Sequence, residues 1–231
     1  MQGYRDPRRE IWEFVYTDLE GLLKEAGKLH GHYCPFLALG VKAGAKGIKM
    51  LDIEHAGMEE VMAIIESNNC FSDGIQYSTG CTFGNNSLIY KDYGKTAVTF
   101  AHRGKENGVR IVVKPDAGEF WENKYPRYSE LFDKVVKNRT GDEKDSQEMM
   151  KLARKISFEV IEADSQKFFK TDRVTPEIPE YAPIFESVTC SKCGEDVMAS
   201  RIVERDGKKL CIPCAGEAYE ELNGSGITHR G

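Results

Sequence analysis

Apolar side chains follow a helical period in the first part of the chain and a strand-like pattern after it. The spacing predicts a helix over 15–29 and another over 35–51, with Pro35 in the first turn of the second. The short apolar run at 61–67 predicts a buried strand, and the residues from Phe71 to Ser78 predict a short helix after it.

The middle of the chain returns to strands and then to helices. Apolar runs at 95–103 and 109–115, separated by a turn containing Asn107-Gly108, predict a hairpin. Amphipathic patterns predict helices over 127–138 and about 145–168, with a break between them. Strands and helices thus occur in one continuous region, which indicates an α+β core domain.

Proline marks the end of this core. Residues 174–183 carry three prolines, so this stretch is expected to be extended rather than helical. The sequence therefore divides into four parts, which are a core domain at 1–173, a linker at 174–186, a small C-terminal domain at 187–223 and a tail at 224–231 that is expected to be disordered.

Composition excludes several function classes. The chain has 231 residues and a net charge of -5, so it offers no basic field, and nucleic acid is not an expected partner. Its apolar runs are too short for a membrane span, and its charged first residues do not resemble a secretory signal. We therefore expect a cytoplasmic protein.

Four of the seven cysteines crowd into the small C-terminal domain. Cys190 and Cys193 are separated by two residues, Cys211 and Cys214 likewise, and 17 residues lie between the pairs. Four thiolates at this spacing complete a tetrahedral structural zinc site. Two redox-active CxxC pairs or an iron–sulfur site are the alternatives.

The residues between these cysteines refine the prediction. A knuckle after Cys193, a hairpin that turns at Asp206-Gly207 and a helix that starts at the second cysteine pair resemble a treble-clef zinc finger. Basic and acidic residues balance in this stretch, which favours a structural or protein-contact role over nucleic-acid binding.

A second group of candidate ligands lies between the first two predicted helices. His30, His32 and Cys34 alternate with Gly31 and Tyr33, immediately before Pro35. Cys34 then sits at a helix N-terminus, where the helix dipole favours the thiolate. The two imidazoles could bind a metal with Cys34 or act as its acid–base partners. An inert cysteine in a surface loop is the alternative.

The segment 66–86 adds further candidates at the end of a predicted strand. Cys81 lies in a turn between glycines, while Cys70 could be functional or simply a small buried apolar residue. Asp73 and Gln76 are one helical turn apart and can project from one face. Together with the histidines, these residues indicate a site for a soft metal or for thiol chemistry.

Both of these motifs resemble those of a known family. The string LHGHYCPFLALGVKAG and the block IIESNNCFSDGIQYSTGCTFGNNSLIYKDYGKTAVTF are similar to the signatures of the FmdE proteins, which are named after formylmethanofuran dehydrogenase. The resemblance implies a thioredoxin-like α+β core with a mixed β-sheet flanked by helices, a metal site in that core and a C-terminal zinc finger. It also implies association with molybdenum or tungsten formylmethanofuran dehydrogenase.

Three hypotheses follow from the residues and the resemblance together. In the first, Cys34, Cys81, His30 and His32 bind a second zinc ion, Cys70 lies just outside its ligands, and Cys34, Cys81, His32 and Asp73 form an active site. In the second, the protein is a non-catalytic accessory component of a molybdenum or tungsten dehydrogenase complex. In the third, Cys34 performs thiol redox chemistry. A homodimer is expected in each case.

Overall fold

The computed structural model describes residues 8–53 and 58–231, which fall into two compact units. The first unit spans Met1–Ile178 and the second spans Pro179–Gly231. This boundary lies inside the proline-containing segment 174–186 that was expected to be the linker. His30, Cys34 and the other core candidates belong to the first unit, and the four clustered cysteines belong to the second.

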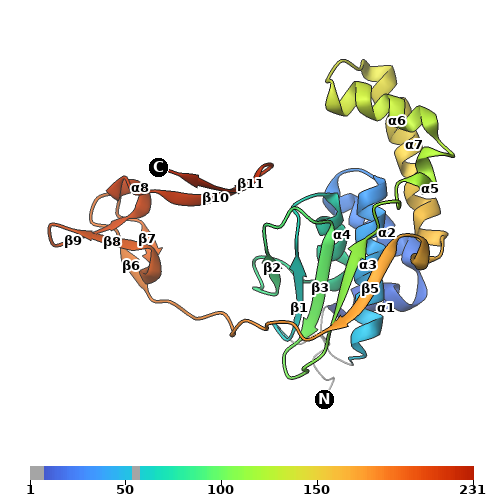
Figure 1. The fold of residues 1–231 in the computed structure, drawn as a ribbon. Helices are drawn as coiled ribbons and strands as arrows, with labels where there is room; N and C mark the ends of the chain where they lie inside the picture. Colours follow the sequence, from blue (N-terminus) through green and yellow to red (C-terminus); the bar gives the residue numbers. More distant parts are fainter. Residues whose placement is uncertain (1–7, 54–57) are drawn as a thin grey trace. The chain divides into compact units, whose positions relative to one another are not determined.

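A five-stranded mixed sheet forms the base of the first unit (Figure 1). Its strands are β1 (Val61–Ile65), β2 (Leu88–Tyr90), β3 (Ala97–His102), β4 (Gly108–Val113) and β5 (Phe169–Val174). They are arranged in the order β2-β1-β3-β4-β5, in which β1 and β2 are parallel and the other neighbours are antiparallel. The predicted α+β class and mixed sheet are therefore confirmed.

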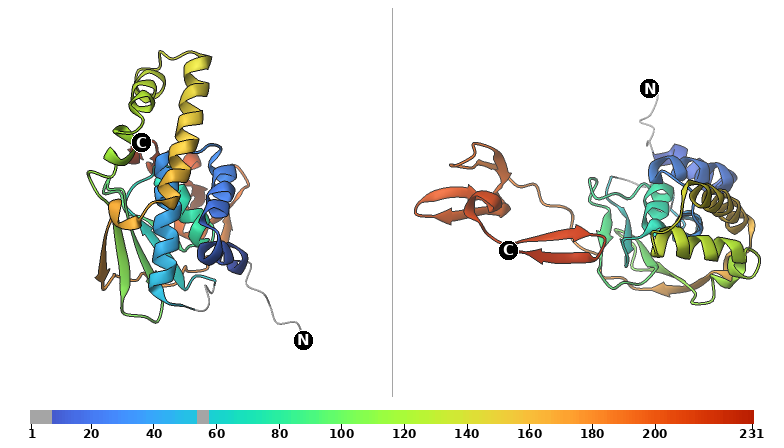
Figure 2. Two further views of the ribbon diagram at one scale, coloured as in Figure 1. Left: turned by 90° about the vertical axis from the view of Figure 1, so that its right-hand side faces the viewer. Right: turned by 90° about the horizontal axis from the view of Figure 1, so that it is seen from above.

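Helices pack against this sheet and extend beyond it. They are α1 (Arg8–Thr17), α2 (Leu19–His30), α3 (Pro35–Leu51), α4 (Cys70–Thr79), the short α5 (Glu119–Glu122), α6 (Pro126–Phe132) and α7 (Glu143–Glu162). A π-helical stretch, Asp133–Lys137, continues α6, and a 3-10 turn, Ser165–Lys167, follows α7. In the left view of Figure 2, α6 and α7 form a helical pair that projects away from the sheet.

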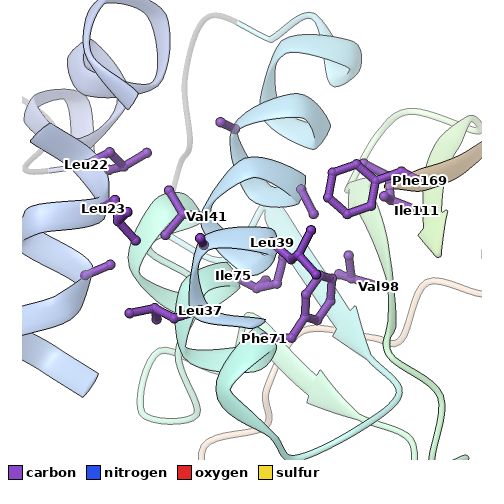
Figure 3. Close-up of a cluster of buried hydrophobic side chains, with 14 of the residues drawn as sticks. Leu22, Leu23, Leu37, Leu39, Val41, Phe71, Ile75, Val98, Ile111 and Phe169 are labelled. Atoms are coloured by element: carbon purple, nitrogen blue, oxygen red, sulfur yellow. The ribbon is translucent and has the colours of Figure 1, made fainter. Parts of the chain in front are cut away.

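The core lies between α3 and one face of the sheet. Ala63, Phe100 and Val109 share that face because they are cross-strand partners, and all three are fully buried. The ring of Phe100 lies directly against Gly47 of α3, where a side chain would overlap it. Figure 3 shows the apolar side chains of α2, α3 and α4 meeting those of the strands, including Leu37, Ile75 and Ile111.

Glycines allow α3 and α4 to pack with their backbones in contact. A Cβ atom on Gly40 would overlap the carbonyl oxygen of Phe71, and one on Gly74 would lie 2.5 Å from the carbonyl oxygen of Leu37. Further along, Gly44 meets the side chain of Ser78. Because residue numbers rise together along both helices, the helices run parallel, and their N-termini lie side by side.

The second unit consists of three small hairpins and one turn of helix. Its strands are β6 (Ser187–Thr189), β7 (Asp196–Met198), β8 (Ile202–Arg205), β9 (Lys208–Cys211), β10 (Tyr219–Asn223) and β11 (Gly226–Arg230). They pair antiparallel as β6-β7, β8-β9 and β10-β11. A 3-10 turn, Ala199–Arg201, precedes β8, and the helix α8 spans Ile212–Ala215. The predicted hairpin at Asp206-Gly207 is the β8-β9 turn.

Three local expectations differ from the structure. The helix after the second cysteine pair ends at Ala215, because Gly216 adopts a left-handed conformation with φ of 66°. The tail at 224–231, expected to be disordered, instead supplies β11, which pairs with β10 over its whole length. The helix expected over 145–168 ends at Glu162, and β5 begins shortly afterwards.

In the part of the chain that the structure describes, no helix combines the length and the apolar character needed to cross a membrane. This agrees with the absence of a long apolar run in the sequence.

Replacing Gly40 with alanine tests the backbone contact between α3 and α4. We expect the variant to lose about 3 kcal/mol of unfolding free energy or more, since the added methyl group meets backbone that cannot move aside. Urea unfolding measures the change. Gly84→Ala is the matched control, because no atom lies within 4 Å of the added carbon there. Equal stability of the two variants would contradict the described packing.

Candidate metal centres

Two cysteines meet where α3 and α4 begin. Cys34 is the N-cap of α3, and its sulfur accepts a hydrogen bond of 3.3 Å from the backbone N–H of Leu37. Cys70 is the first residue of α4, directly after its N-cap Asn69. The positive ends of two helix dipoles therefore lie at these sulfurs and favour negative charge there.

Two histidines reach the same place from the end of α2. That helix ends at His30 because Gly31 adopts a left-handed conformation, φ 86°, and its N–H bonds to the carbonyl oxygen of Gly27. The turn brings the rings of His30 and His32 to a centroid separation of 4.3 Å. One potential ligand atom from each of His30, His32, Cys34 and Cys70 lies within 4.8 Å of the other three. We call these four residues the core Cys/His group.

A carboxylate orients the first of these histidines. Nδ1 of His30 lies 2.7 Å from Oδ2 of Asp73, whose other oxygen accepts a hydrogen bond of 3.1 Å from the side-chain amide of Gln76. With Nδ1 bound to the carboxylate, Nε2 of His30 is the nitrogen left for a ligand. That Nε2 is buried and has no hydrogen-bond partner among the described residues.

The charges within the group are unequal. The pKa of Cys70 is lowered, first by its hydrogen bond with Cys34 and further by the nearby His30. The pKa of Cys34 is raised, first by the same partner and then by burial. Burial, followed by the proximity of His30, lowers the pKa of His32. These shifts favour the thiolate at Cys70, the thiol at Cys34 and the neutral form of His32.

These donors fit a transition metal such as zinc. Two imidazoles and two thiols are the ligand types of tetrahedral zinc sites, in which a metal-bound histidine usually donates its second N–H to a carboxylate. Asp73 and His30 form that arrangement, and the unpartnered Nε2 of His30 is the buried polar atom that a metal would satisfy.

An open pocket of about 1360 Å³ adjoins the core Cys/His group. His32, Cys34 and Cys70 line one part of it, and aromatic side chains from α5 and α6, including Trp121 and Tyr128, line another. A molecule in this pocket would therefore contact three members of the group directly.

The four C-terminal cysteines form a second group. Cys190, Cys193, Cys211 and Cys214 bring their sulfur atoms within 4.8 Å of one another, and the sulfurs of Cys193 and Cys211 are 3.9 Å apart. A tetrahedral zinc with bonds of about 2.3 Å places its sulfur ligands about 3.8 Å apart. Backbone N–H groups, including that of Cys211, lower the pKa of Cys190 and so favour the thiolate that zinc requires.

Comparison with known proteins finds a family match in each of the two units. Residues 29–170 match the model of the family described as FmdE, molybdenum formylmethanofuran dehydrogenase operon. The chain belongs to the FmdE family. Residues 183–220 match the prokaryotic dksA/traR C4-type zinc finger, which confirms the predicted family and its C-terminal zinc finger.

One curated protein and one solved structure are similar to this FmdE chain. A protein of Archaeoglobus fulgidus, named as a probable S-adenosyl-L-methionine-binding protein, is 41% identical over 215 residues. The alignment covers 91% of this chain but 57% of that relative, so the chain spans little more than half its length. A tungsten formylmethanofuran dehydrogenase FmdE-like protein of Syntrophus aciditrophicus has a similar fold, with a TM-score of 0.56 and 20% identity over 87% of this chain and 95% of that one.

The core Cys/His group differs from the expected ligand set in a single member. Cys81 does not join the core Cys/His group of this FmdE chain. It is fully buried after the end of α4, with its sulfur 3.4 Å from the carbonyl oxygen of Val61, and burial raises its pKa. Cys70, expected just outside the ligands, takes its place because α4 begins beside α3. Asn69 before Cys70 was the available signal, since asparagine is a preferred N-cap.

The paired cysteines can be distinguished by their reactivity in metal-free protein. We expect iodoacetamide to alkylate Cys70 faster than Cys34. The alkylation rate of Cys70 should be half-maximal at a pH below the ordinary cysteine pKa of about 8.5. The Cys34→Ala substitution should move that midpoint upward, because it removes the hydrogen bond that stabilises the thiolate. Peptide mass spectrometry over a pH series measures both rates, and the buried Cys81 serves as an unreactive reference. Preferential alkylation of Cys34 would contradict this assignment.

Proposed function

We propose that the core unit of this FmdE protein binds a transition metal, most simply zinc, through His30, His32, Cys34 and Cys70. The observation that carries the proposal is the buried Nε2 of His30, which lacks a partner among the described residues while Asp73 holds the opposite ring nitrogen. Cys70 as the favoured thiolate and His32 as a neutral imidazole supply donors in the protonation states that a metal requires.

The placement of the site supports a role beyond structure. His32, Cys34 and Cys70 line the adjoining pocket, so a bound molecule would reach the metal side of the group. A metal held there would supply Lewis-acid character to a ligand that entered its coordination sphere. Asp73 acts as a positioning residue through His30, and Gln76 holds Asp73 in turn. Cys81 has no part in the proposed site.

Metal content distinguishes the proposed ligand set from the one expected from the sequence. We expect wild-type protein purified with zinc to contain about two zinc atoms per chain, one bound by each cysteine-containing group. Cys70→Ala should reduce the count to about one, whereas Cys81→Ala should leave it at two. Elemental analysis measures the counts. One zinc in the wild type, or a loss on Cys81→Ala instead of Cys70→Ala, would contradict the proposal.

The contribution of Asp73 can be measured separately. Removal of a carboxylate that orients a ligating histidine lowers metal affinity by about 10-fold to about 100-fold. We expect Asp73→Ala to weaken the core site by this amount and to leave the C-terminal site unchanged. Competition with a chromophoric chelator measures both affinities. Equal effects on the two sites would indicate general destabilisation rather than loss of ligand orientation.

A second candidate function is that of an accessory protein that contacts a molybdenum or tungsten dehydrogenase complex. The observation that favours it is the exposure of large apolar side chains on the second unit, where Ile184 is fully exposed and Met198 and Leu222 are also exposed. Copurification from native extract, with the captured proteins identified by mass spectrometry, tests it. Ile184→Asp should abolish capture of the dehydrogenase, and capture that is unaffected would count against this surface.

Other expectations from the sequence remain proposals of the same kind. We propose a cytoplasmic location, a homodimer, a thioredoxin-like relationship for the core and a treble-clef relationship for the second unit. The mixed sheet supports the thioredoxin-like relationship. The β8-β9 hairpin between the cysteine pairs, followed by α8 at the second pair, supports the treble-clef relationship. The shortness of α8 and the hairpin after it are departures that a treble-clef assignment has to accommodate.

A further inference from the structure

We propose that the pocket beside the core Cys/His group binds a small organic anion with a flat, aromatic body, and that Lys95 recognises its negative charge. The proposal rests on the proposed function in one respect, namely that the charged end of the ligand lies next to the metal site. The rest of the proposal is supported by the shape and chemistry of the pocket.

The walls of the pocket suit an aromatic body. Phe36 and Trp121 meet edge to face with centroids 6.2 Å apart, and Tyr128 lies 6.1 Å from Phe132. Trp121 and Tyr128 are themselves almost completely buried, so other side chains hold their rings in place. Preformed aromatic walls of this kind favour flat ligands that can stack or meet the rings at their edges.

The volume of the pocket indicates a ligand at the large end of the small-molecule range. About 1360 Å³ exceeds the roughly 300–1,000 Å³ of ordinary ligand sites, and the pocket is open on one side. It therefore accommodates a ligand of cofactor size with part of its surface in solvent. Since His32, Cys34 and Cys70 form part of the lining, the ligand can extend from the aromatic walls to the metal side of the group.

The lysines at the pocket determine the preferred charge. Lys114 donates to the carbonyl oxygen of Gln166 at 2.7 Å, and Lys137 forms an ion pair with Asp133 at 2.6 Å. Lys95, in contrast, is exposed and has no ion-pair partner among the residues that the structure describes. Of the three lysines that line the pocket, Lys95 is the one whose charge is available to a ligand.

Lys95 lines the pocket and is next in sequence to a residue that contacts the N-cap of α4. It precedes Thr96, whose hydroxyl accepts a hydrogen bond of 3.3 Å from the side chain of Asn69, and Asn69 precedes Cys70. The acidic lining residues belong to other elements: Glu130 and Asp133 are paired with Arg127 and Lys137, and Glu122 lies on α5 beside Trp121. An anionic group is therefore favoured next to the core Cys/His group, with the ligand body against the aromatic walls.

Two fluorescent probes that differ in one charge test this arrangement. The anionic probe is 8-anilinonaphthalene-1-sulfonate, and the neutral probe is N-phenyl-1-naphthylamine, which has the same aromatic body without the sulfonate. Trp12→Phe leaves Trp121 as the single tryptophan of the chain, so quenching of its emission reports binding in the pocket. We expect both probes to quench the emission of Trp121, and the anionic probe to do so at a lower concentration than the neutral probe.

The lysine variants decide whether Lys95 recognises the charge. Lys95→Met should lower the affinity for the anionic probe by about tenfold or more, because a hydrogen-bonded ion pair is lost. The affinity for the neutral probe should not change. Lys144→Met makes the same charge change at an exposed position that does not line the pocket, so it should alter neither affinity. Equal weakening of both probes by Lys95→Met, or equal effects of the two lysine variants, would overturn the assignment of Lys95.

The remaining outcomes separate this inference from the proposed function. Each titration is repeated on protein whose zinc content has been measured. Two zinc atoms per chain without quenching by either probe would overturn the pocket and leave the metal site intact. Quenching with the expected Lys95 dependence but a single zinc would support the pocket and overturn the core metal. Quenching that appears only on dilution of a dimer would show that a second copy fills the pocket, and would also overturn the inference.

Discussion

The backbone contact between α3 and α4 is the constraint on which the candidate site depends. Gly40 and Gly74 let the two helices approach to a distance that any side chain would prevent. Because the helices run parallel, this contact places Cys34 and Cys70 together at two helix N-termini. The same helix α3 presses Gly47 onto Phe100 of the sheet, so the position of the site and the packing of the core are coupled.

The chemistry of the site follows from this placement. Two helix dipoles and a shared hydrogen bond favour one thiolate, at Cys70, while burial keeps His32 neutral. Asp73 holds His30 in one orientation from the first turn of α4, the helix that also supplies Cys70. Three of the four candidate ligands then line an aromatic pocket, which connects the proposed metal site to the proposed recognition of an organic molecule.

Local sequence patterns predicted most elements but could not predict their approach in space. The HGHYCP string indicated the end of one helix and the start of another at Pro35, with Cys34 at its N-terminus, and the structure confirms both. Cys70 and Cys81 both follow predicted elements, and only the parallel contact of α3 and α4 determines which of them meets Cys34. The strand β11 was missed because residues 224–231 are rich in glycine and polar side chains, while its pairing with β10 is a tertiary property.

X-ray absorption at the zinc edge of the intact, zinc-loaded protein tests the central claim most directly. One site of four cysteines together with one of two cysteines and two histidines predicts an average of about three sulfur ligands near 2.3 Å and about one nitrogen ligand near 2.0 Å per zinc. The Asp73–His30 hydrogen bond predicts that the nitrogen shell includes a well-ordered imidazole. A spectrum of four sulfur ligands with no imidazole scattering would show that zinc occupies the C-terminal group alone, and would contradict a metal site at the start of α3 and α4.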